Sequence, residues 1–91
     1  MAGEIRDNVE RSRFELDVGG LVVFASYRRQ GAHLAIYHVE APPPLRGTGA
    51  ADRLMRGVVE TARQEGLKIL PYCGYAGAWI RRHREHRDLL A

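Results

Sequence analysis

Three consecutive prolines, Pro42 to Pro44, divide the sequence into two parts whose apolar residues repeat with different periods. Before them, apolar residues alternate with polar ones or form short β-branched and aromatic runs, which favours strands. After them, apolar residues recur every three to four positions, which favours a helix. Because proline cannot donate a hydrogen bond to a sheet, the triplet ends the last strand of the first part. The sequence therefore predicts a sheet followed by a helix.

The first part predicts an antiparallel meander of three strands joined by glycine turns. The strands are expected at Arg13–Val18, Leu21–Tyr27 and His33–Glu40. Residues 1–12 are polar and are predicted to form a flexible N-terminus. We therefore expect a single folded domain over residues 13–91.

The second part predicts a helix, a parallel strand and a final helix. An apolar stripe at helical spacing runs through Ala50, Leu54, Val58 and Ala62, with Asp52 in the first turn and Gly66 after the last. A short fourth strand is expected at Leu67–Tyr72, and a strand, helix and strand in succession favour a right-handed parallel crossover. The last helix is expected from about Ala76, with Trp79 and Ile80 as its apolar contacts. These elements together predict an α+β fold.

The chain has 91 residues, of which 45% are hydrophobic and 27% are charged. This length suits one small domain with a shallow core, and the composition is that of a globular protein. No apolar run approaches the ~20 residues of a membrane span, and the first residues lack the apolar region of a signal peptide. We therefore expect a soluble cytoplasmic protein with no membrane partner. The net charge of +3 favours an anionic partner only weakly.

The segment RGTGAA places two glycines directly before the helix. A helix N-terminus presents unpaired N–H groups and partial positive charge, and glycines let a ligand approach them closely. Glycines in this position also serve as plain turn residues, and the segment alone does not separate the two interpretations. The lysine of a P-loop and the third glycine of a dinucleotide-binding fold are both missing, so neither nucleotide fold fits.

RGTGAA matches the R/Q-x-x-G-x-G/A signature of the GNAT superfamily of acetyl-CoA-dependent N-acetyltransferases. The segments HVEAPPPLRGTG, LPYC and WIRRHREHRDLL further resemble the small, single-domain branch of that superfamily. Departures from the branch pattern fall at Val39, Ala41, Trp79, Arg84 and His86. The resemblance implies a minimal GNAT-like fold with acetyl-CoA as cosubstrate and no metal. It also implies that the loop holds the pyrophosphate of coenzyme A, through Arg46, Gly47, Thr48, Gly49, Ala50 and Ala51.

His38, Glu40 and Cys73 are the candidate catalytic residues. A period of two would place His38 and Glu40 on the same sheet face as Leu34 and Ile36, and Cys73 follows the predicted fourth strand. A histidine at a strand end and a buried cysteine both have ordinary structural explanations. However, the C-terminal ends of parallel neighbouring strands lie together beside the intervening helix, which is where ligands bind in open α/β sheets. The resemblance implies that His38 and Cys73 are active-site residues.

Two mechanisms are open at this point. In direct transfer, an amine attacks the thioester while His38 or Glu40 accepts a proton. In covalent transfer, Cys73, activated by His38, takes the acetyl group first. Tyr72 or Tyr75 is a candidate hydrogen-bond donor near the thioester. The sequence does not separate a small-molecule amine from a protein lysine as acceptor, or a monomer from a homodimer.

Three other functions are weighed against acetyl transfer. Cys73 is the only cysteine, so the H-x-E and P-x-C segments lack the ligand set of a zinc deaminase. In the basic tail RRHREHR, a solvated helix face is favoured over a nucleic-acid patch, and His83 and His86 are expected to face water. A non-catalytic module that binds coenzyme A or nucleic acid through the same fold is the alternative to an enzyme.

Overall fold

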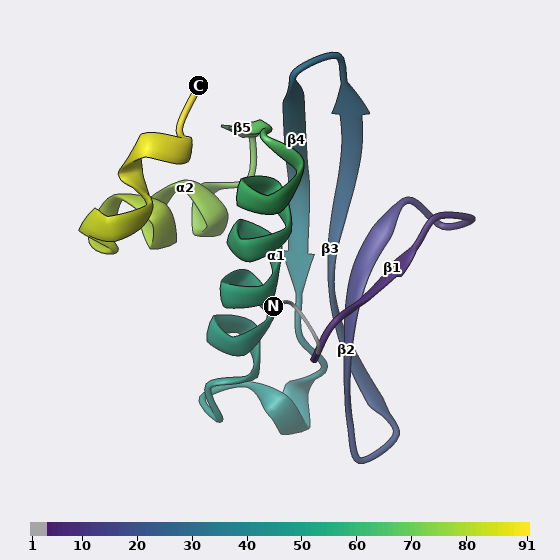
Figure 1. Cartoon of the computed structure of the whole chain (residues 1–91). Helices are drawn as coiled ribbons and strands as arrows, with labels where there is room; N and C mark the ends of the chain where they lie inside the picture. Colours follow the sequence, from purple (N-terminus) through teal and green to yellow (C-terminus); the bar gives the residue numbers. More distant parts are fainter. Residues whose placement is uncertain (1–3) are drawn as a thin grey trace.

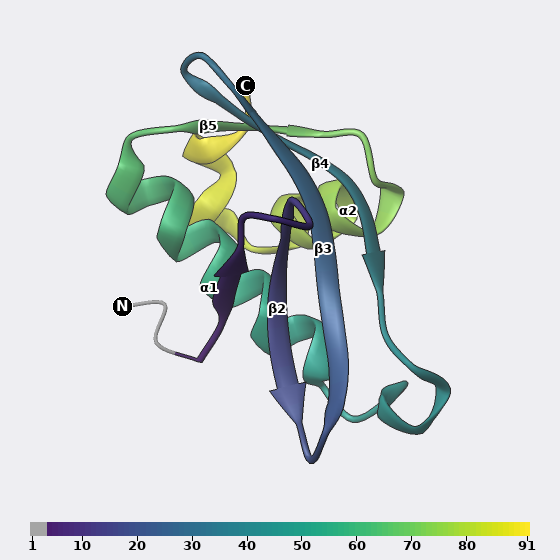
Figure 2. The same ribbon diagram turned by 90° about the vertical axis from the view of Figure 1, so that its right-hand side faces the viewer.

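The computed structural model describes residues 4–91 and shows one mixed sheet with two α-helices (Figure 1). The strands lie in the order β1-β2-β3-β4-β5, and only the β4–β5 pair is parallel among those described. Both helices cover the same face of the sheet, and the other face is open, as two perpendicular views show (Figures 1 and 2). The bounds are β1 Arg6–Asn8, β2 Arg13–Val18, β3 Leu21–Gln30, β4 His33–Glu40, α1 Ala50–Glu65, β5 Lys68–Pro71 and α2 Gly74–Arg82.

The predicted meander is confirmed, with two differences in extent. β2 and β4 have the expected bounds, but β3 runs three residues further than predicted because Arg28, Arg29 and Gln30 continue to pair with the start of β4. The segment expected to be flexible contains β1, which pairs antiparallel with β2. The meander therefore has four strands, and residues 1–3 lie outside the described part.

The elements after the prolines follow the predicted crossover. α1 begins after Gly49 and ends before Gly66, and both glycines have the left-handed φ that favours glycine (86° and 70°). β5 lies parallel to β4, as expected. α2 begins two residues before the predicted Ala76. Short 3-10 helices occupy Pro43–Leu45 (η1) and Arg84–Leu89 (η2).

The core lies between the sheet and the two helices. Its largest fully buried side chains come from both layers, and they include Phe14, Leu16, Leu34, Ile36, Leu54, Met55, Ile69, Trp79 and Ile80. Burial of Trp79 and Ile80 confirms their predicted role as the apolar contacts of the last helix. No helix in residues 4–91 is long and apolar enough to cross a membrane.

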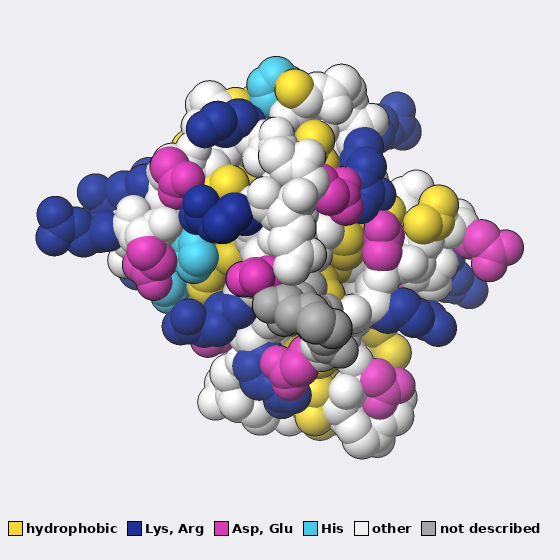
Figure 3. Space-filling model, viewed as in Figure 1, with side chains coloured by type: hydrophobic (Ala, Val, Ile, Leu, Met, Phe, Trp, Pro, Cys, Tyr) yellow, Lys and Arg dark blue, Asp and Glu magenta, His cyan; other side chains and the backbone are white. Residues whose placement is uncertain are grey.

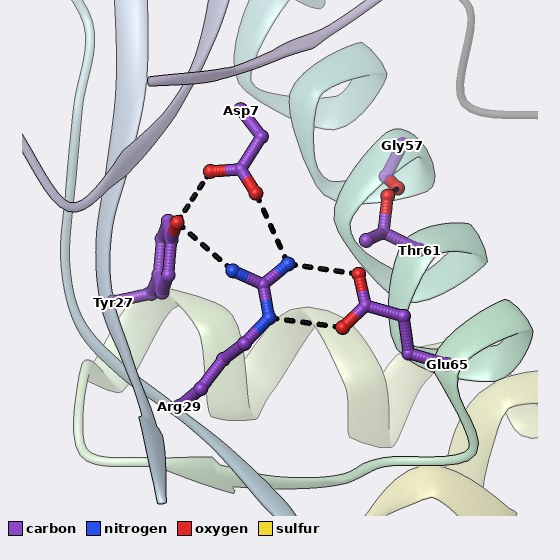
Figure 4. Close-up of polar contacts among 6 residues, drawn as sticks. All are labelled: Asp7, Tyr27, Arg29, Gly57, Thr61 and Glu65. Carbon is purple, nitrogen blue, oxygen red and sulfur yellow. Dashed lines mark hydrogen bonds and ion pairs between the residues drawn. The ribbon is translucent and has the colours of Figure 1, made fainter. Parts of the chain in front are cut away.

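A polar network ties the edge of the meander to α1 (Figure 4). The Arg29 guanidinium donates to the Glu65 carboxylate at 2.8 and 2.9 Å and to the Asp7 carboxylate at 3.0 Å. The hydroxyl of Tyr27 donates to the other Asp7 oxygen and accepts from Arg29. These bonds join β1, β3 and α1, so the short polar strand β1 is held by side chains as well as by its pairing with β2.

Candidate functional site

The glycine loop forms one wall of a cavity of about 310 Å³ at the N-terminus of α1. Gly47 and Gly49 have φ of 76° and 86°, and no atom lies within 4 Å of where a Cβ would stand on either. The backbone there therefore faces open space. The lining residues are Ala41, Leu45, Arg46, Gly47, Gly49, Ala50, Ala51, Asp52 and Tyr75.

Five of the six predicted cofactor residues line this cavity, and Thr48 has another role. The Thr48 hydroxyl donates to the Leu45 carbonyl at 2.5 Å and accepts from the Ala50 amide at 3.3 Å, which fixes the turn into α1. The exposed Arg46 donates from Nε to the Ala41 carbonyl at 3.2 Å. Because the first N–H groups of a helix have no intrahelical acceptor, this end of α1 suits an anion.

β5 pairs only with the first half of β4. Their pairing ends at Ile36 with Pro71, and the Cys73 amide then donates to the Ile36 carbonyl at 3.0 Å. The pairing of β4 with β3 continues to Glu40. The last residues of β4 are therefore not paired with β5 on that side, and the chain continues from there to Ala41 at the cavity wall.

A β-bulge places His38 and Glu40 on the open face of the sheet. The register of β3 and β4 shifts between Ser26 and Tyr27, so Ile36 pairs with Tyr27 but His38 pairs with Ser26. Ile36 lies in the core, whereas His38 shares the face of Phe24, whose ring it meets edge-on at 6.3 Å. The prediction that His38 and Glu40 share a face with Leu34 and Ile36 is therefore wrong, because the bulge reverses the alternation.

His38 and Glu40 form a solvent-accessible pair. The His38 Nε2 and Glu40 Oε1 atoms are 2.9 Å apart, and both side chains are more than half exposed (58% and 55%). A carboxylate at this distance orients the imidazole and stabilises it when it carries a proton. The pair is therefore arranged as a base with its orienting group, accessible from the open face.

Cys73 lies at the start of α2 and is partly buried against the core. The preceding Tyr72 stacks on Tyr37, the residue before His38, with ring centroids 5.3 Å apart. The structure thus brings Cys73 and His38 to neighbouring strand ends. Among the described contacts there is no hydrogen bond between them, because His38 is turned to Glu40 on the open face.

Asp52 belongs to the cavity wall, although the sequence indicated only a helix start. Its carboxylate accepts hydrogen bonds from Trp79 Nε1 at 2.8 Å and from Arg56 Nε at 2.9 Å. Burial acts to raise the pKa of Asp52, but the bonds from Trp79 and Arg56 outweigh it and the pKa is lowered. Burial, followed by the Asp52 charge, raises the pKa of Tyr75. Tyr75 therefore stays a phenol at neutral pH and can donate a proton or a hydrogen bond.

His83 and His86 do not simply face water, contrary to the prediction. Their rings stack on Trp79 with centroid distances of 3.8 and 5.7 Å, and both are partly buried. The reason is that the chain turns at His83 into η2, which folds back on α2. Arginine and lysine side chains gather over this end of the molecule, interspersed with acids (Figure 3). Within residues 4–91, no group of three or more His, Cys, Asp or Glu side chains is arranged to hold a metal ion.

Comparison with known proteins gives matches over almost the whole chain. Residues 13–89 match the GCN5-related N-acetyl-transferase family. The fold matches the solution structure of a GCN5-like candidate N-acetyltransferase from Staphylococcus aureus, with a TM-score of 0.75 and 26% sequence identity. That match covers 97% of this chain and 87% of the other. No curated protein matches the chain at significant similarity.

Proposed function

Because the chain belongs to the GCN5-related N-acetyltransferase family, we propose that it transfers an acetyl group from acetyl-CoA to an amine. The observation that carries this proposal is the open cavity where Gly47 and Gly49 meet the first turn of α1. Its backbone donors and the partial positive charge of the helix end suit a pyrophosphate. Arg46, Gly47, Gly49, Ala50 and Ala51 would contact that group, and Thr48 would hold the loop in shape.

The separation of β4 from β5 supports the same placement of the cosubstrate. An extended chain that carries amide groups can pair with an open strand edge through backbone hydrogen bonds. The arm of coenzyme A contains two amides, and the edge of β4 that does not pair with β5 follows Ile36 and leads to Ala41 at the cavity wall. The thioester would then lie between the ends of β4 and β5.

Direct transfer is the mechanism that the contacts favour. The acceptor nitrogen forms a bond to the acetyl carbon, the C–S bond breaks, and the thiolate of coenzyme A leaves. His38 takes the proton that the nitrogen loses, and Glu40, 2.9 Å away, stabilises the imidazolium. Tyr75, as a neutral phenol at the cavity wall, can protonate the leaving thiolate. The open face above His38 leaves room for a small amine or for a lysine on a protein surface.

Calorimetry with coenzyme A tests the binding step. Gly49→Glu adds a carboxylate to the cavity and strains a positive φ, so we expect it to abolish binding. Gly31→Glu is the matched control. Gly31 also has a positive φ (60°) and open space where a Cβ would stand, but it lies in the turn between β3 and β4 and does not line the cavity. The proposal fails if the wild-type chain binds no coenzyme A at millimolar concentration, or if both variants bind equally well.

Covalent transfer through Cys73 is a second candidate, supported by the position of this cysteine after the end of β5, where its amide donates to the carbonyl of Ile36, two residues before His38. Intact-mass spectrometry after mixing with acetyl-CoA distinguishes it. A gain of about 42 Da that disappears in Cys73→Ala indicates an acetyl-enzyme. Undiminished turnover in Cys73→Ala leaves only the direct route. Loss of all transfer in wild-type protein that still binds coenzyme A would indicate a non-catalytic binding module.

A further inference from the structure

Asp52 connects the cavity to α2. Among the described residues that line the cavity, it is the only acid. Both of its carboxylate oxygens are engaged, one by Trp79 Nε1 at 2.8 Å and the other by Arg56 Nε at 2.9 Å. Its carboxylate is therefore held between Trp79 of α2 and Arg56, one turn along α1.

Trp79 has little freedom to move. Its side chain is 1% exposed, the ring of His83 stacks on it at 3.8 Å, and the Arg56 guanidinium lies 5.8 Å from its ring centroid. His83 Nδ1 also lies 2.7 Å from the Trp79 carbonyl oxygen. The indole N–H therefore points at Asp52 from a fixed position.

The position of the Asp52 charge matters because the cavity suits an anion. A carboxylate that is free to turn toward the loop repels a bound pyrophosphate and competes for the amides of the first turn. A carboxylate bound to an indole N–H and a guanidinium has much of its charge compensated. Trp79 can thus affect anion binding without contacting the anion.

We propose that Trp79 is a positioning residue for the cavity: its hydrogen bond holds the Asp52 carboxylate away from the bound anion and fixes α2, which starts after Cys73, against the first turn of α1. This proposal rests on the proposed function, because the anion is the pyrophosphate of coenzyme A. It concerns residues that do not themselves take part in acetyl transfer.

Two substitutions separate the charge of Asp52 from the hydrogen bond. Asp52→Asn removes the charge but keeps an oxygen that accepts from Trp79. Trp79→Phe removes the donor but keeps the charge and most of the ring. By calorimetry, we expect Asp52→Asn to strengthen coenzyme A binding by about threefold to tenfold and Trp79→Phe to weaken it by a similar factor. A purely structural contact would weaken binding in both variants.

The single cysteine gives a second readout that does not require coenzyme A. We expect maleimide to label Cys73 several-fold faster in Trp79→Phe and in Asp52→Ala, because both lose the hydrogen bond that holds α2, which begins directly after Cys73, against the first turn of α1. Asp52→Asn should label at the wild-type rate. Asp52→Ala changes a partly exposed residue, so it remains informative if Trp79→Phe does not fold.

The outcomes are distinguishable from those of the proposed function. If wild-type protein binds no coenzyme A, the proposed function fails. The labelling rates alone then test whether the hydrogen bond from Trp79 to Asp52 holds α2 against α1. Equal losses of affinity in Asp52→Asn and Trp79→Phe would overturn the proposal. Wild-type labelling rates in both Trp79→Phe and Asp52→Ala would also overturn it.

Discussion

His38 lies on the open face of the sheet, while the cavity at the start of α1 is lined by other residues. In the proposed function, binding of coenzyme A and proton transfer would therefore depend on different side chains. We expect His38→Ala to lower kcat by about a hundredfold or more, the range found for loss of a general base, with little change in affinity for coenzyme A. The rate of free-thiol release from acetyl-CoA and calorimetry measure the two quantities. Glu40→Gln should have a smaller effect, because the imidazole remains.

His33→Ala is the control for this prediction. It removes a histidine from the other end of the same strand, where β4 begins. An unchanged kcat in His38→Ala, or an equal loss in His33→Ala, would contradict the role of His38 as base.

The hydrogen bonds of Glu15 predict how the stability of the folded state depends on pH. Hydrogen bonds from Arg6, and then from Arg13 and Asn8, outweigh burial and lower the pKa of Glu15 from 4.5 to about 2. The folded state thus holds the carboxylate more strongly than the unfolded chain does. This stabilisation is complete above pH 4.5 and is lost as the pH falls toward 2.

Glu15→Gln should therefore cost about 1–2 kcal/mol at neutral pH, a value reduced for the exposure of its arginine partners. The cost should shrink as the pH falls from 4.5 to 2. Urea unfolding at several pH values measures it, with the exposed Glu10→Gln as control. A cost that is the same at pH 7 and pH 3 would contradict the assignment.

At the scale of the elements, the segment before β1 packs on α1 through one glycine. A Cβ on Gly57 would stand 2.7 Å from the Cγ2 of Ile5, so the glycine gives Ile5 a place against the helix. Alanine normally stabilises a helix interior by about 0.5–1 kcal/mol relative to glycine. In the wild-type chain, we expect that Gly57→Ala does not raise the free energy of unfolding, because the added methyl group clashes with Ile5. In an Ile5→Ala background, the same substitution should raise it. A double-mutant cycle by urea unfolding measures the coupling, and additive effects would contradict the contact.

Elements with a strong period could be predicted from the sequence, and those without one could not. β2, β4 and α1 have apolar residues at regular spacing, so their bounds followed directly. β1 has the sequence RDN, which carries no apolar alternation. This strand is instead held by side-chain partners such as Glu15 and Tyr27, which the sequence of β1 does not reveal. The bulge in β4 was also not predicted, because the change from Leu34 and Ile36 to His38 and Glu40 along one predicted face equally suits a strand end. The shift in register is visible only in the pairing with β3.

In the candidate site, too, local motifs could be predicted from the sequence, whereas contacts between distant residues could not. The loop from Arg46 to Ala51 is a local motif, so its place at a helix start could be predicted. The link between Asp52 and Trp79 joins residues 27 positions apart, and its recognition requires the packing of α2 on α1. The stacking of His83 and His86 on Trp79 likewise depends on the turn into η2.

At the scale of the whole molecule, one sheet face is open and a chain of 91 residues has a shallow core. Such a domain has a small free energy of unfolding, so a ligand that binds only the folded state should raise its melting temperature substantially. As the proposed cosubstrate, coenzyme A at 100 times its Kd would add about 2.7 kcal/mol. For a domain of this size, each kcal/mol corresponds to roughly 4–8 °C. We therefore expect a rise of about 10–20 °C.

The cavity residues determine which variants keep this shift. Gly31→Glu should lower the melting temperature of the free protein through backbone strain and still show the full rise, because the glycine loop is untouched. Gly49→Glu should lower it by a similar amount and show no rise. His38→Ala should also keep the full rise, since it removes the proposed base on the open face and leaves the cavity intact. A rise that persists in Gly49→Glu would mean that coenzyme A stabilises the molecule from another surface.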